Sequence, residues 1–337
     1  MTATAGGAAR DVVGIGNAII DIIAHADEDF LARHALTKGA MNLIDDDFAE
    51  RLYAAMPPAV EASGGSCANT MAGIASFGGR AGYIGKVRDD AFGRIFRHDI
   101  RAIGVDFETA PATDGPPTAR SLILVTPDAQ RTMHTHLGAC VHLGPEDVDP
   151  AFVQSARIVY LEGYLWDPPA AKRALLKAAE AAHAAGRMVS LTLSDPFCVE
   201  RHRDSFRELI TRHVDLLFAN EAEILSLYQV TDFADAVAAV RNDCAVAALT
   251  RSAKGSVLVS GDAVIEVAAE PAARVVDTTG AGDQYAAGFL FGHARGLPLA
   301  ECGRLGSLAA AEVIGHVGPR PEIRLADLLD AAGTDAA

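Results

Sequence analysis

Residues 277–283, DTTGAGD, place two aspartates and two glycines immediately before an apolar helix pattern. Glycine permits the tight turn that opens such a helix, and the first helical turn has backbone N–H groups without intrahelical partners. These groups and the helix dipole favour an anion, so the turn formed by Gly280, Ala281 and Gly282 is a candidate phosphate site. Asp283 is then either a helix cap or a base that accepts a proton beside the anion.

A second polar pair, Asn220 and Glu223, follows an apolar strand pattern. An amide three residues before a carboxylate is typical of a helix capping box, and this explanation stands beside a functional one. Carboxylate and amide oxygens also suit Mg²⁺, directly or through water. Together with the anion turn and Asp283, the pair supplies what phosphoryl transfer requires: donors for charged oxygens, a base for an acceptor hydroxyl and a magnesium site.

Two other groups of polar residues are weaker candidates. Glu162 and Asp167 could form a carboxylate pair for acid–base chemistry, but solvated loop charges explain them better. A histidine-rich segment has metal-type side chains, although its spacing matches no standard structural zinc site and ordinary polar lining is the favoured explanation. These side chains are His134, His136, Cys140 and His142.

The composition restricts the kind of partner that the protein can have. The chain has 337 residues, a formal net charge of −15 and 50% hydrophobic residues, so it can bury a large core. A nucleic-acid polymer or an anionic membrane surface would need a basic surface that this acidic chain lacks. No apolar run approaches the ~20 residues of a spanning helix, and the cysteines are scattered without a C-x-x-C pair. We therefore expect a cytoplasmic protein, monomeric or homodimeric, that acts on small molecules.

Strand and helix patterns alternate along most of the chain, and they predict the elements that position these residues. The alternation indicates an α/β fold with a doubly wound, mostly parallel sheet flanked by helices. Ligands bind beyond the carboxyl ends of the strands in such sheets. The polar residues Asn17, Asp21, Asp195, Asn220 and Asp277 all follow or end strand patterns, so we expect several of them to meet at that edge.

Residues 118–137 break the alternation, because two strand patterns flank a Pro-Asp turn and predict a β-hairpin. A single long strand pattern covers residues 11–25, and its second half could join the hairpin in a small β appendage. The predicted organisation has an α/β core, a discontinuous β appendage and two flexible tails. The core comprises residues 10–20, 46–115 and 139–330, the appendage residues 21–45 and 116–138, and the tails residues 1–9 and 331–337.

These motifs resemble the signatures of the ribokinase-like (PfkB) family of sugar and nucleoside kinases, and the resemblance covers nearly the whole chain. DTTGAGD resembles the C-terminal signature of the family, SGGSCANT at residues 63–70 resembles the N-terminal signature, and NEAE at residues 220–223 is similar to the N-x-x-E magnesium and phosphate motif. The resemblance implies a ribokinase-like fold whose β appendage is a lid. It also implies phosphorylation of an alcohol by ATP with Mg²⁺, and it is compatible with activation by a monovalent cation such as K⁺.

Within the family, the chain is most similar to the adenosine kinases, through GIGNAIIDI at residues 14–22, LEGYLW at 161–166, LTLSDPF at 191–197 and QRTMHTHLGAC at 130–140. The resemblance makes Asp283 the catalytic base and brings Arg131 to the transferred phosphate. It places Tyr164 beside the purine. The implied ribose-binding residues are Asn17, Asp21, Gly64, Gly65 and Asn69.

The resemblance also assigns an ATP side to the site. Asn220 and Glu223 organise Mg²⁺ through water. The family's T-x-G-x-x-G motif corresponds to TRSAKG, in which Thr250 and Gly255 match the pattern and Ser252 replaces the first glycine.

The prediction is a kinase that phosphorylates the 5′-hydroxyl of adenosine or a related ribonucleoside with ATP, a reaction of purine salvage. A kinase for fructose, ribose or a similar sugar is the alternative within the family, since it would use Asp283 and Asn220 without needing Tyr164 against a base. A non-catalytic nucleoside or nucleotide sensor is the alternative from another class, because a fold does not fix a function. The presence of Asp283 argues against the sensor.

Overall fold

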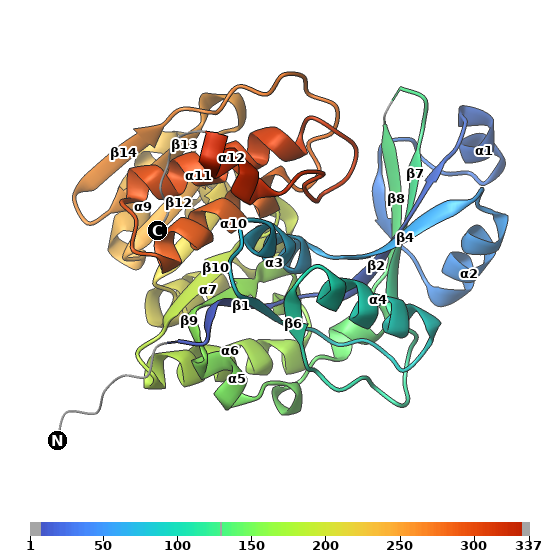
Figure 1. The fold of residues 1–337 in the computed structure, drawn as a ribbon, viewed down its shortest axis with the longest axis horizontal. Coiled ribbons are helices and arrows are strands. Elements are labelled where there is room, and N and C mark those ends of the chain that lie inside the picture. The colour runs from blue at the N-terminus through green and yellow to red at the C-terminus, as the bar shows by residue number, and fades with distance from the viewer. Residues whose placement is uncertain (1–7, 129, 332–337) are drawn as a thin grey trace.

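The computed structural model describes residues 8–128 and 130–331, so the tails predicted at residues 1–9 and 331–337 lie almost entirely outside the described residues. Within the described part, the chain forms a nine-stranded sheet and a five-stranded sheet. Figure 1 shows the small sheet standing to one side of the large sheet and its helices.

The large sheet has the order β14-β13-β12-β11-β10-β9-β1-β5-β6. Neighbouring strands are parallel except that β13 runs antiparallel to both β12 and β14. This mostly parallel sheet confirms the predicted α/β class. Its strands are β1 (Arg10–Ile15), β5 (Ala81–Ile84), β6 (Val105–Phe107), β9 (Ala156–Glu162), β10 (Met188–Thr192), β11 (Leu216–Asn220), β12 (Val246–Thr250), β13 (Ser256–Ser260) and β14 (Ala263–Val267).

Helices cover both faces of the large sheet, because alternate residues of its buried strands point to opposite sides. On β9, Val159 belongs to the core under the helices α5 to α9, whereas Tyr160 belongs to the core shared with α3 and α10. The helices around this sheet are α3 (Ser66–Ser76), α4 (Ala91–Ala102), α5 (Pro150–Gln154), α6 (Pro169–Ala184), α7 (Pro196–His213), α8 (Glu221–Tyr228), α9 (Phe233–Asp243), α10 (Ala281–Ala294), α11 (Leu299–Val313) and α12 (Leu325–Ala331). Short 3₁₀ helices are η1 (Gly138–His142), η2 (Pro145–Asp147), η3 (Gly163–Trp166) and η4 (Ser252–Lys254).

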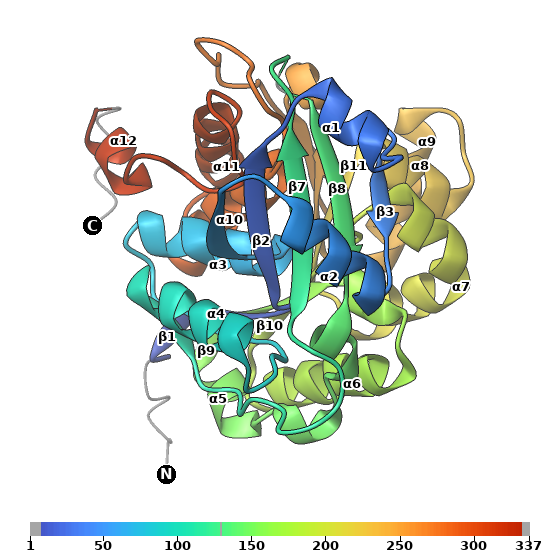
Figure 2. The same ribbon diagram turned by 90° about the vertical axis from the view of Figure 1, so that its right-hand side faces the viewer.

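The small sheet has the order β3-β8-β7-β2-β4, and Figure 2 looks onto it with α2 in front of β7 and β8. The predicted hairpin is confirmed, since β7 and β8 pair antiparallel around the Pro127–Asp128 turn. One boundary differs from the prediction: residues 46–64 were assigned to the core, but β4 pairs with β2 in the small sheet. The elements here are β2 (Ile19–His25), β3 (Met41–Leu43), β4 (Ala59–Gly64), β7 (Ala119–Val125), β8 (Arg131–His136), α1 (Glu28–Arg33) and α2 (Asp46–Ala55).

The single strand predicted over residues 11–25 is wrong, because the chain breaks at residues 16–18 and continues in the other sheet. Almost every residue of β1 is buried, as in a strand covered on both faces, whereas β2 alternates buried and more exposed residues as in a strand covered on one face. Gly16 allows the close packing at the break, since a Cβ there would lie 2.4 Å from the Cβ of Cys67. Asn17 is therefore held in the short connection between the two sheets.

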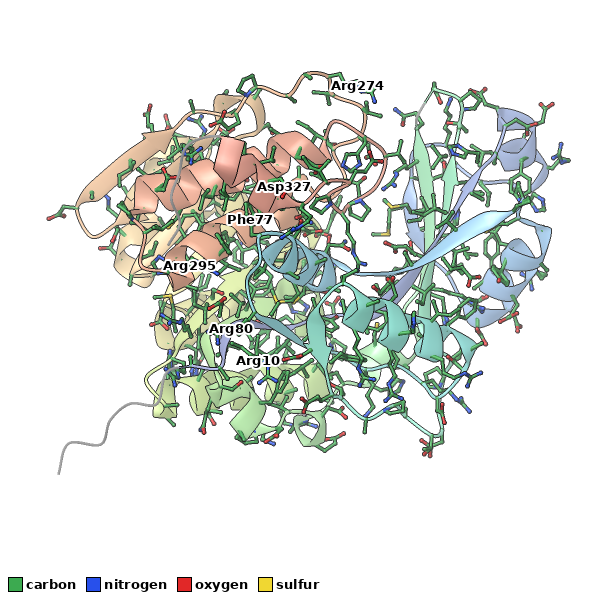
Figure 3. The ribbon with its side chains drawn as sticks, in the orientation of Figure 1. Arg10, Phe77, Arg80, Arg274, Arg295 and Asp327 are labelled. Atoms are coloured by element: carbon green, nitrogen blue, oxygen red, sulfur yellow. The ribbon has the colours of Figure 1, made fainter. Side chains whose placement is uncertain are left out.

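Buried charge at the amino end of β1 lies away from the small sheet. Asp11 accepts a hydrogen bond from the backbone N–H of Arg80 (2.9 Å), and the guanidinium groups of Arg80 and Arg295 each lie 3.5 Å from its carboxylate. Figure 3 shows Arg80 and Arg295 on the side of the molecule opposite the small sheet. This ion cluster belongs to the packing of the core and not to the carboxyl edge where ligands are expected.

Candidate active site

The N-terminus of α10 forms the predicted anion turn. Gly280 is its N-cap with φ 78°, a left-handed conformation that favours glycine. Within the described residues, the N–H groups of Gly280 and Gly282 have no acceptor in the chain, but that of Ala281 donates to the carbonyl of Thr278 (3.2 Å). Two of the three predicted backbone donors are thus free for an anion, and the third is already engaged.

Asp283 lies in the first turn of α10 and is held by α3. The hydroxyl of Ser66 donates to its Oδ1 (2.6 Å), and the Nδ2 of Asn69 lies 3.5 Å from its Oδ2. Burial raises the pKa of Asp283 to about 6, although these hydrogen bonds and the charge of Arg320 act in the opposite direction. A carboxylate with this pKa is ionised near neutral pH and can still accept a proton readily.

Asp21 reaches the same place from β2 of the small sheet. Gly64 provides the space for it, because a Cβ at Gly64 would lie 2.2 Å from the Asp21 carboxylate. Gly65 has φ 98°, and a Cβ there would collide with the carbonyl oxygen of Asn17 at 2.2 Å. Burial raises the pKa of Asp21 to about 6, and the carboxylate of Asp283 adds to this rise. The N-terminal signature therefore uses its two glycines to bring both carboxylates together.

Glu162 corrects one interpretation of the sequence, because it is 1% exposed and not a solvated loop charge. Its Oε1 accepts the side-chain amide of Asn17 (2.7 Å), and its Oε2 accepts the backbone N–H of Cys67 (3.0 Å). Burial raises the pKa of Glu162 to about 7. The position at the end of an apolar strand was the signal in the sequence, since a charge there must find partners at the carboxyl edge of the sheet.

Arg131 extends from β8 of the small sheet to the turn before α10. Its Nε lies 3.1 Å from the Oδ2 of Asp277, the first aspartate of the DTTGAGD motif. Its side chain is 6% exposed, and both terminal nitrogens are buried without a hydrogen-bond partner among the described residues. Donors left unpaired in this way favour binding of an anion such as phosphate, which a guanidinium recognises well.

Arg320, in the loop after α11, is a site residue that the sequence analysis missed. Its Nε donates to the Oδ1 of Asn69 (3.0 Å), and its charge lowers the pKa values of Asp21 and Asp283. No motif in the sequence pointed to it, because its hydrogen-bond partners, Asn69 and Asp99, lie 251 and 221 residues earlier in the chain. We call Asp283, Ser66, Asn69, Asp21, Asn17, Glu162 and Arg320 the aspartate cluster.

Asn220 and Glu223 form the capping box at the start of α8. Asn220 Oδ1 accepts the N–H of Glu223 (2.9 Å), while Glu223 Oε2 accepts the N–H of Asn220 (2.9 Å). Burial raises the pKa of Glu223 to about 7. With both groups engaged with each other and Glu223 5% exposed, magnesium fits here through bound water better than through direct ligation.

The predicted ATP loop follows the neighbouring strand. Thr250 ends β12 directly opposite Asn220 in the parallel register, so the two motifs share one edge of the sheet. Ser252 has φ 52°, the left-handed conformation that the glycine of the family pattern would adopt freely. Gly255 has φ 84°, and a Cβ there would lie 2.0 Å from the carbonyl oxygen of Val267. We call Asn220, Glu223, Thr250, Ser252 and Gly255 the N-x-x-E cluster.

Tyr164 lies in η3, immediately after the strand that ends in Glu162. It is half-buried, and its backbone N–H donates to the hydroxyl of Ser194 (3.1 Å). Burial raises the pKa of its phenol, so the ring is neutral at physiological pH. In the described part of the chain, no hydrogen bond or ion pair links the aspartate cluster to the N-x-x-E cluster.

The described residues contain no group of three or more His, Cys, Asp or Glu side chains arranged to hold a metal ion. The histidine-rich segment lies on β8 and η1. None of the helices in the described part is long and apolar enough to cross a membrane. The five cysteines are buried and free.

Comparisons with known proteins agree with this geometry. Residues 39–324 match the sequence profile described as "pfkB family carbohydrate kinase". The crystal structure of adenosine kinase from Sinorhizobium meliloti is 56% identical, with a TM-score of 0.88 over 96% of this chain and 99% of that one. A probable sugar kinase from Rhizobium etli CFN 42 is 52% identical, with a TM-score of 0.89 and the same coverage. The ATP-dependent ribose-1-phosphate kinase of Halopiger xanaduensis is 33% identical over 236 residues, 68% of this chain and 73% of that protein.

Proposed function

The chain belongs to the pfkB family of carbohydrate kinases and is an ATP-dependent, adenosine kinase-like enzyme, and from this premise we propose that it phosphorylates the 5′-hydroxyl of adenosine or a related ribonucleoside. The observation that carries the proposal is the position of Asp283, a carboxylate with a raised pKa beside the free N–H groups of a helix N-terminus. This arrangement suits a base that must act next to a phosphoryl group.

Asp283 accepts the proton of the acceptor hydroxyl while that oxygen attacks the γ-phosphorus of ATP. The bond between the γ-phosphorus and the bridging oxygen breaks, and ADP leaves with that oxygen. The N–H groups of Gly280 and Gly282 and the free guanidinium nitrogens of Arg131 receive the charge of the transferred group. Ala281 contributes to the shape of the turn, since its own N–H is used by Thr278.

The ribose is held by residues at the junction of the two sheets. Asp21 and the oxygen of the Asn17 amide accept hydrogen bonds from sugar hydroxyls, and Gly64 and Gly65 leave room for the Asp21 carboxylate and the Asn17 carbonyl to reach this position. Asn69 holds Asp283 against the acceptor oxygen. Positioning of this kind contributes several kcal/mol to lowering the barrier, on the order of 7 kcal/mol in well-oriented systems.

Asn220 and Glu223 would hold magnesium through bound water, and Thr250, Ser252 and Gly255 would line the nucleotide on the ATP side. When bound, Mg²⁺ neutralises charge on the β- and γ-phosphate oxygens of ATP. The small sheet acts as a lid: it carries Asp21 and Arg131 to the reaction and excludes water, which limits hydrolysis of ATP.

A coupled ADP-release assay tests the proposal. Purified protein with MgATP is offered adenosine, inosine, guanosine, cytidine, ribose and fructose, in buffers containing K⁺ or Na⁺. We expect turnover to be highest on adenosine, and a difference between the two buffers would establish activation by a monovalent cation. Turnover on free sugars alone would contradict the nucleoside assignment, and nucleoside binding without turnover would identify a sensor.

The high similarity to a probable sugar kinase keeps a sugar as the second candidate acceptor. The variant Tyr164→Ala separates the two, because only a nucleoside has a base to stack on this ring. We expect the nucleoside KM to rise by the equivalent of roughly 1–3 kcal/mol, while kinetics with a free sugar change little. An unchanged nucleoside KM would remove Tyr164 from base binding.

A further inference from the structure

The guanidinium of Arg320 is held in place by side chains from two different helices. Its Nε donates to Asn69 Oδ1 (3.0 Å), and its Nη1 lies 3.3 Å from the Oδ2 of Asp99 on α4. Its Nη2 is buried and has no hydrogen-bond partner in the part of the chain that the structure describes. The guanidinium thus bridges α3 and α4, and its Nη2 group remains available as a hydrogen-bond donor.

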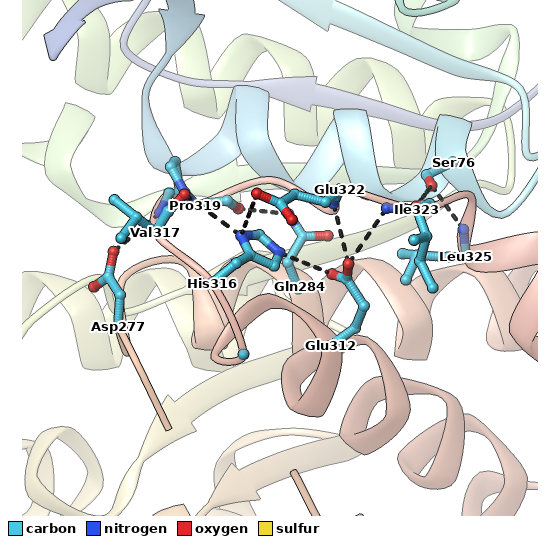
Figure 4. Close-up of polar contacts among 12 residues, drawn as sticks. Ser76, Asp277, Gln284, Glu312, His316, Val317, Pro319, Glu322, Ile323 and Leu325 are labelled. Carbon is cyan, nitrogen blue, oxygen red and sulfur yellow. Dashed lines mark hydrogen bonds and ion pairs between the residues drawn. The ribbon is translucent and has the colours of Figure 1, made fainter. Parts of the chain in front are cut away.

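The loop that carries Arg320 is fixed on both sides of it. Gln284, next to the proposed base, donates from Nε2 to the carbonyl of Pro319 (3.0 Å). On the other side, Glu312 accepts the backbone N–H of Glu322 (3.0 Å), as Figure 4 shows. Two anchors within two residues of Arg320 mean that its position is set before any ligand binds.

The same loop also contacts the anion turn. The carboxylate of Asp277 accepts the N–H of Gly318 (3.1 Å), and a Cβ at Gly280 would lie 2.6 Å from Pro319. The segment therefore packs against the N-terminal turn of α10, where Asp283 lies.

The hydrogen bond from Arg320 determines which way the Asn69 amide faces. Because the Oδ1 of Asn69 accepts from Arg320, its Nδ2 is the atom left to donate toward Asp283. A reversed amide would place two acceptors against each other at Asp283 and would leave Nε of Arg320 without its acceptor.

The electrostatic surroundings of Asp283 explain why a cation is needed there. Burial raises the pKa of Asp283, and within its cluster the positive charge that lowers this pKa is that of Arg320. The ionisable groups that interact electrostatically with Asp283 from other elements are Asp21 on β2, Cys67 on α3, Tyr160 and Glu162 on β9, Tyr164 on η3 and Arg320. Arg131 on β8 acts on Asp21.

We propose that Arg320 is a positioning residue for the base: it orients the Asn69 amide toward Asp283 and supplies the positive charge that keeps Asp283 ionised. The inference rests on the proposed function, since a base at Asp283 has a role only if the chain transfers a phosphoryl group to a hydroxyl.

The test measures kcat/KM for the preferred acceptor from pH 5 to pH 9 in wild-type protein and in Arg320→Gln. Loss of the positive charge raises the pKa of the base, so the acid limb of the profile moves to higher pH. The loss of kcat/KM in Arg320→Gln is consequently larger at pH 6 than at pH 8. At pH 8 the base is ionised in both proteins, so the loss that remains there measures the effect of the misoriented Asn69 amide. The matched control Arg324→Gln removes an exposed arginine from the same loop and leaves the profile unchanged.

A second variant, Arg320→Lys, separates charge from geometry and serves if Arg320→Gln does not fold. Lysine keeps the charge but cannot bridge Asn69 and Asp99 with a planar fork. We expect an acid limb close to that of wild type together with a lower kcat. An acid limb that does not move in a folded Arg320→Gln, or a kcat unchanged in Arg320→Lys, overturns the inference. Wild-type protein that turns over no acceptor would instead overturn the proposed function.

Discussion

The aspartate cluster and the N-x-x-E cluster, which we propose to be two halves of one site, are assembled by the chain in different ways. Asp283 takes its hydrogen bond from Ser66, 217 residues away, and Asn17 reaches Glu162 over 145 residues. Asn220 and Glu223 instead bond to each other across three residues of a single helix start. One half depends on the whole fold, whereas the other depends on local structure.

The difference also appears in the charges. The aspartate cluster contains three carboxylates whose pKa values burial raises, and the charge of Arg320 lowers the pKa values of two of them, Asp21 and Asp283. In the N-x-x-E cluster there is a single carboxylate, Glu223, whose pKa burial raises, while the backbone N–H of Asn220 at the helix start acts in the opposite direction. We therefore expect substitutions in the first cluster to change the chemical step and its pH dependence, and substitutions in the second to change binding of MgATP.

The largest effect is expected for Asp283→Asn. The amide keeps the shape of the side chain but cannot accept the proton, so kcat should fall by roughly 10² or more with a folded protein. Initial rates from ADP release, together with a thermal melt, measure this. The control Asp232→Asn replaces the cap of α9, where asparagine is an equally good cap, and should keep full activity. Wild-type turnover in Asp283→Asn would show that the chemical step does not depend on this cluster.

Glu223→Gln should separate the two clusters most clearly. Glutamine can complete a capping box, so the fold should be kept, but the charge that orders water on magnesium is lost. We expect the KM for MgATP to rise by roughly 10–100-fold, the usual cost of an outer-shell change, while the KM for the acceptor stays near wild type. A change in the acceptor KM alone would contradict the division of the site into two halves.

The variant Glu162→Gln tests how the aspartate cluster affects stability. Glu162 has a pKa of about 7 when folded and an ordinary value of 4.5, so the folded state holds its proton more tightly than the unfolded state. Its contribution is present below pH 4.5 and is lost as the pH rises to about 7, amounting to about 2 kcal/mol between pH 5 and pH 7.

Urea unfolding of wild type and Glu162→Gln at pH 5, 6, 7 and 8 measures this contribution. Between pH 5 and pH 7, the decrease in the free energy of unfolding should be about 2 kcal/mol smaller in the variant than in wild type. Glu180→Gln, which makes the same change at an exposed carboxylate on α6, is the control and should follow the wild-type slope. Parallel curves for wild type and Glu162→Gln would mean that Glu162 stays ionised in the fold.

The smallest effect is expected for Ser252→Gly in the N-x-x-E cluster. Serine pays a conformational cost at φ 52° that glycine avoids, so the variant should gain about 1 kcal/mol or less in the free energy of unfolding. Urea denaturation measures the gain, and the KM for ATP should not change. A less stable variant would show that the serine side chain makes a contribution larger than the strain of its backbone.

The sequence predicts best what local pattern determines. The alternation of strands and helices, the hairpin at residues 118–137 and the capping box at Asn220 follow from periodicity and residue type within short windows. The glycine turn before Asp283 is readable for the same reason, because its backbone conformation requires glycine at residue 280 itself.

What the sequence could not predict depends on contacts between distant segments. Glu162 looked like a loop charge because its two partners lie about 100 and 145 residues earlier. Arg320 belongs to no recognisable motif, and only its position beside Asn69 in the folded chain indicates a role for it. The pairing of β4 with β2 was missed because Ala59–Gly64, with the sequence AVEASG, has no clear strand pattern of its own.

The break between β1 and β2 has a consequence for how such an enzyme could change its substrate in evolution or in the laboratory. The chain crosses from one sheet to the other at residues 16–18 and returns at Gly65, and these crossings contain Asn17 and Gly65, two of the residues proposed to hold the ribose. A small sheet recombined from a relative would have to be joined at those residues. New acceptors are therefore more accessible through single substitutions along β2, β7 and β8 than through exchange of the sheet as a module.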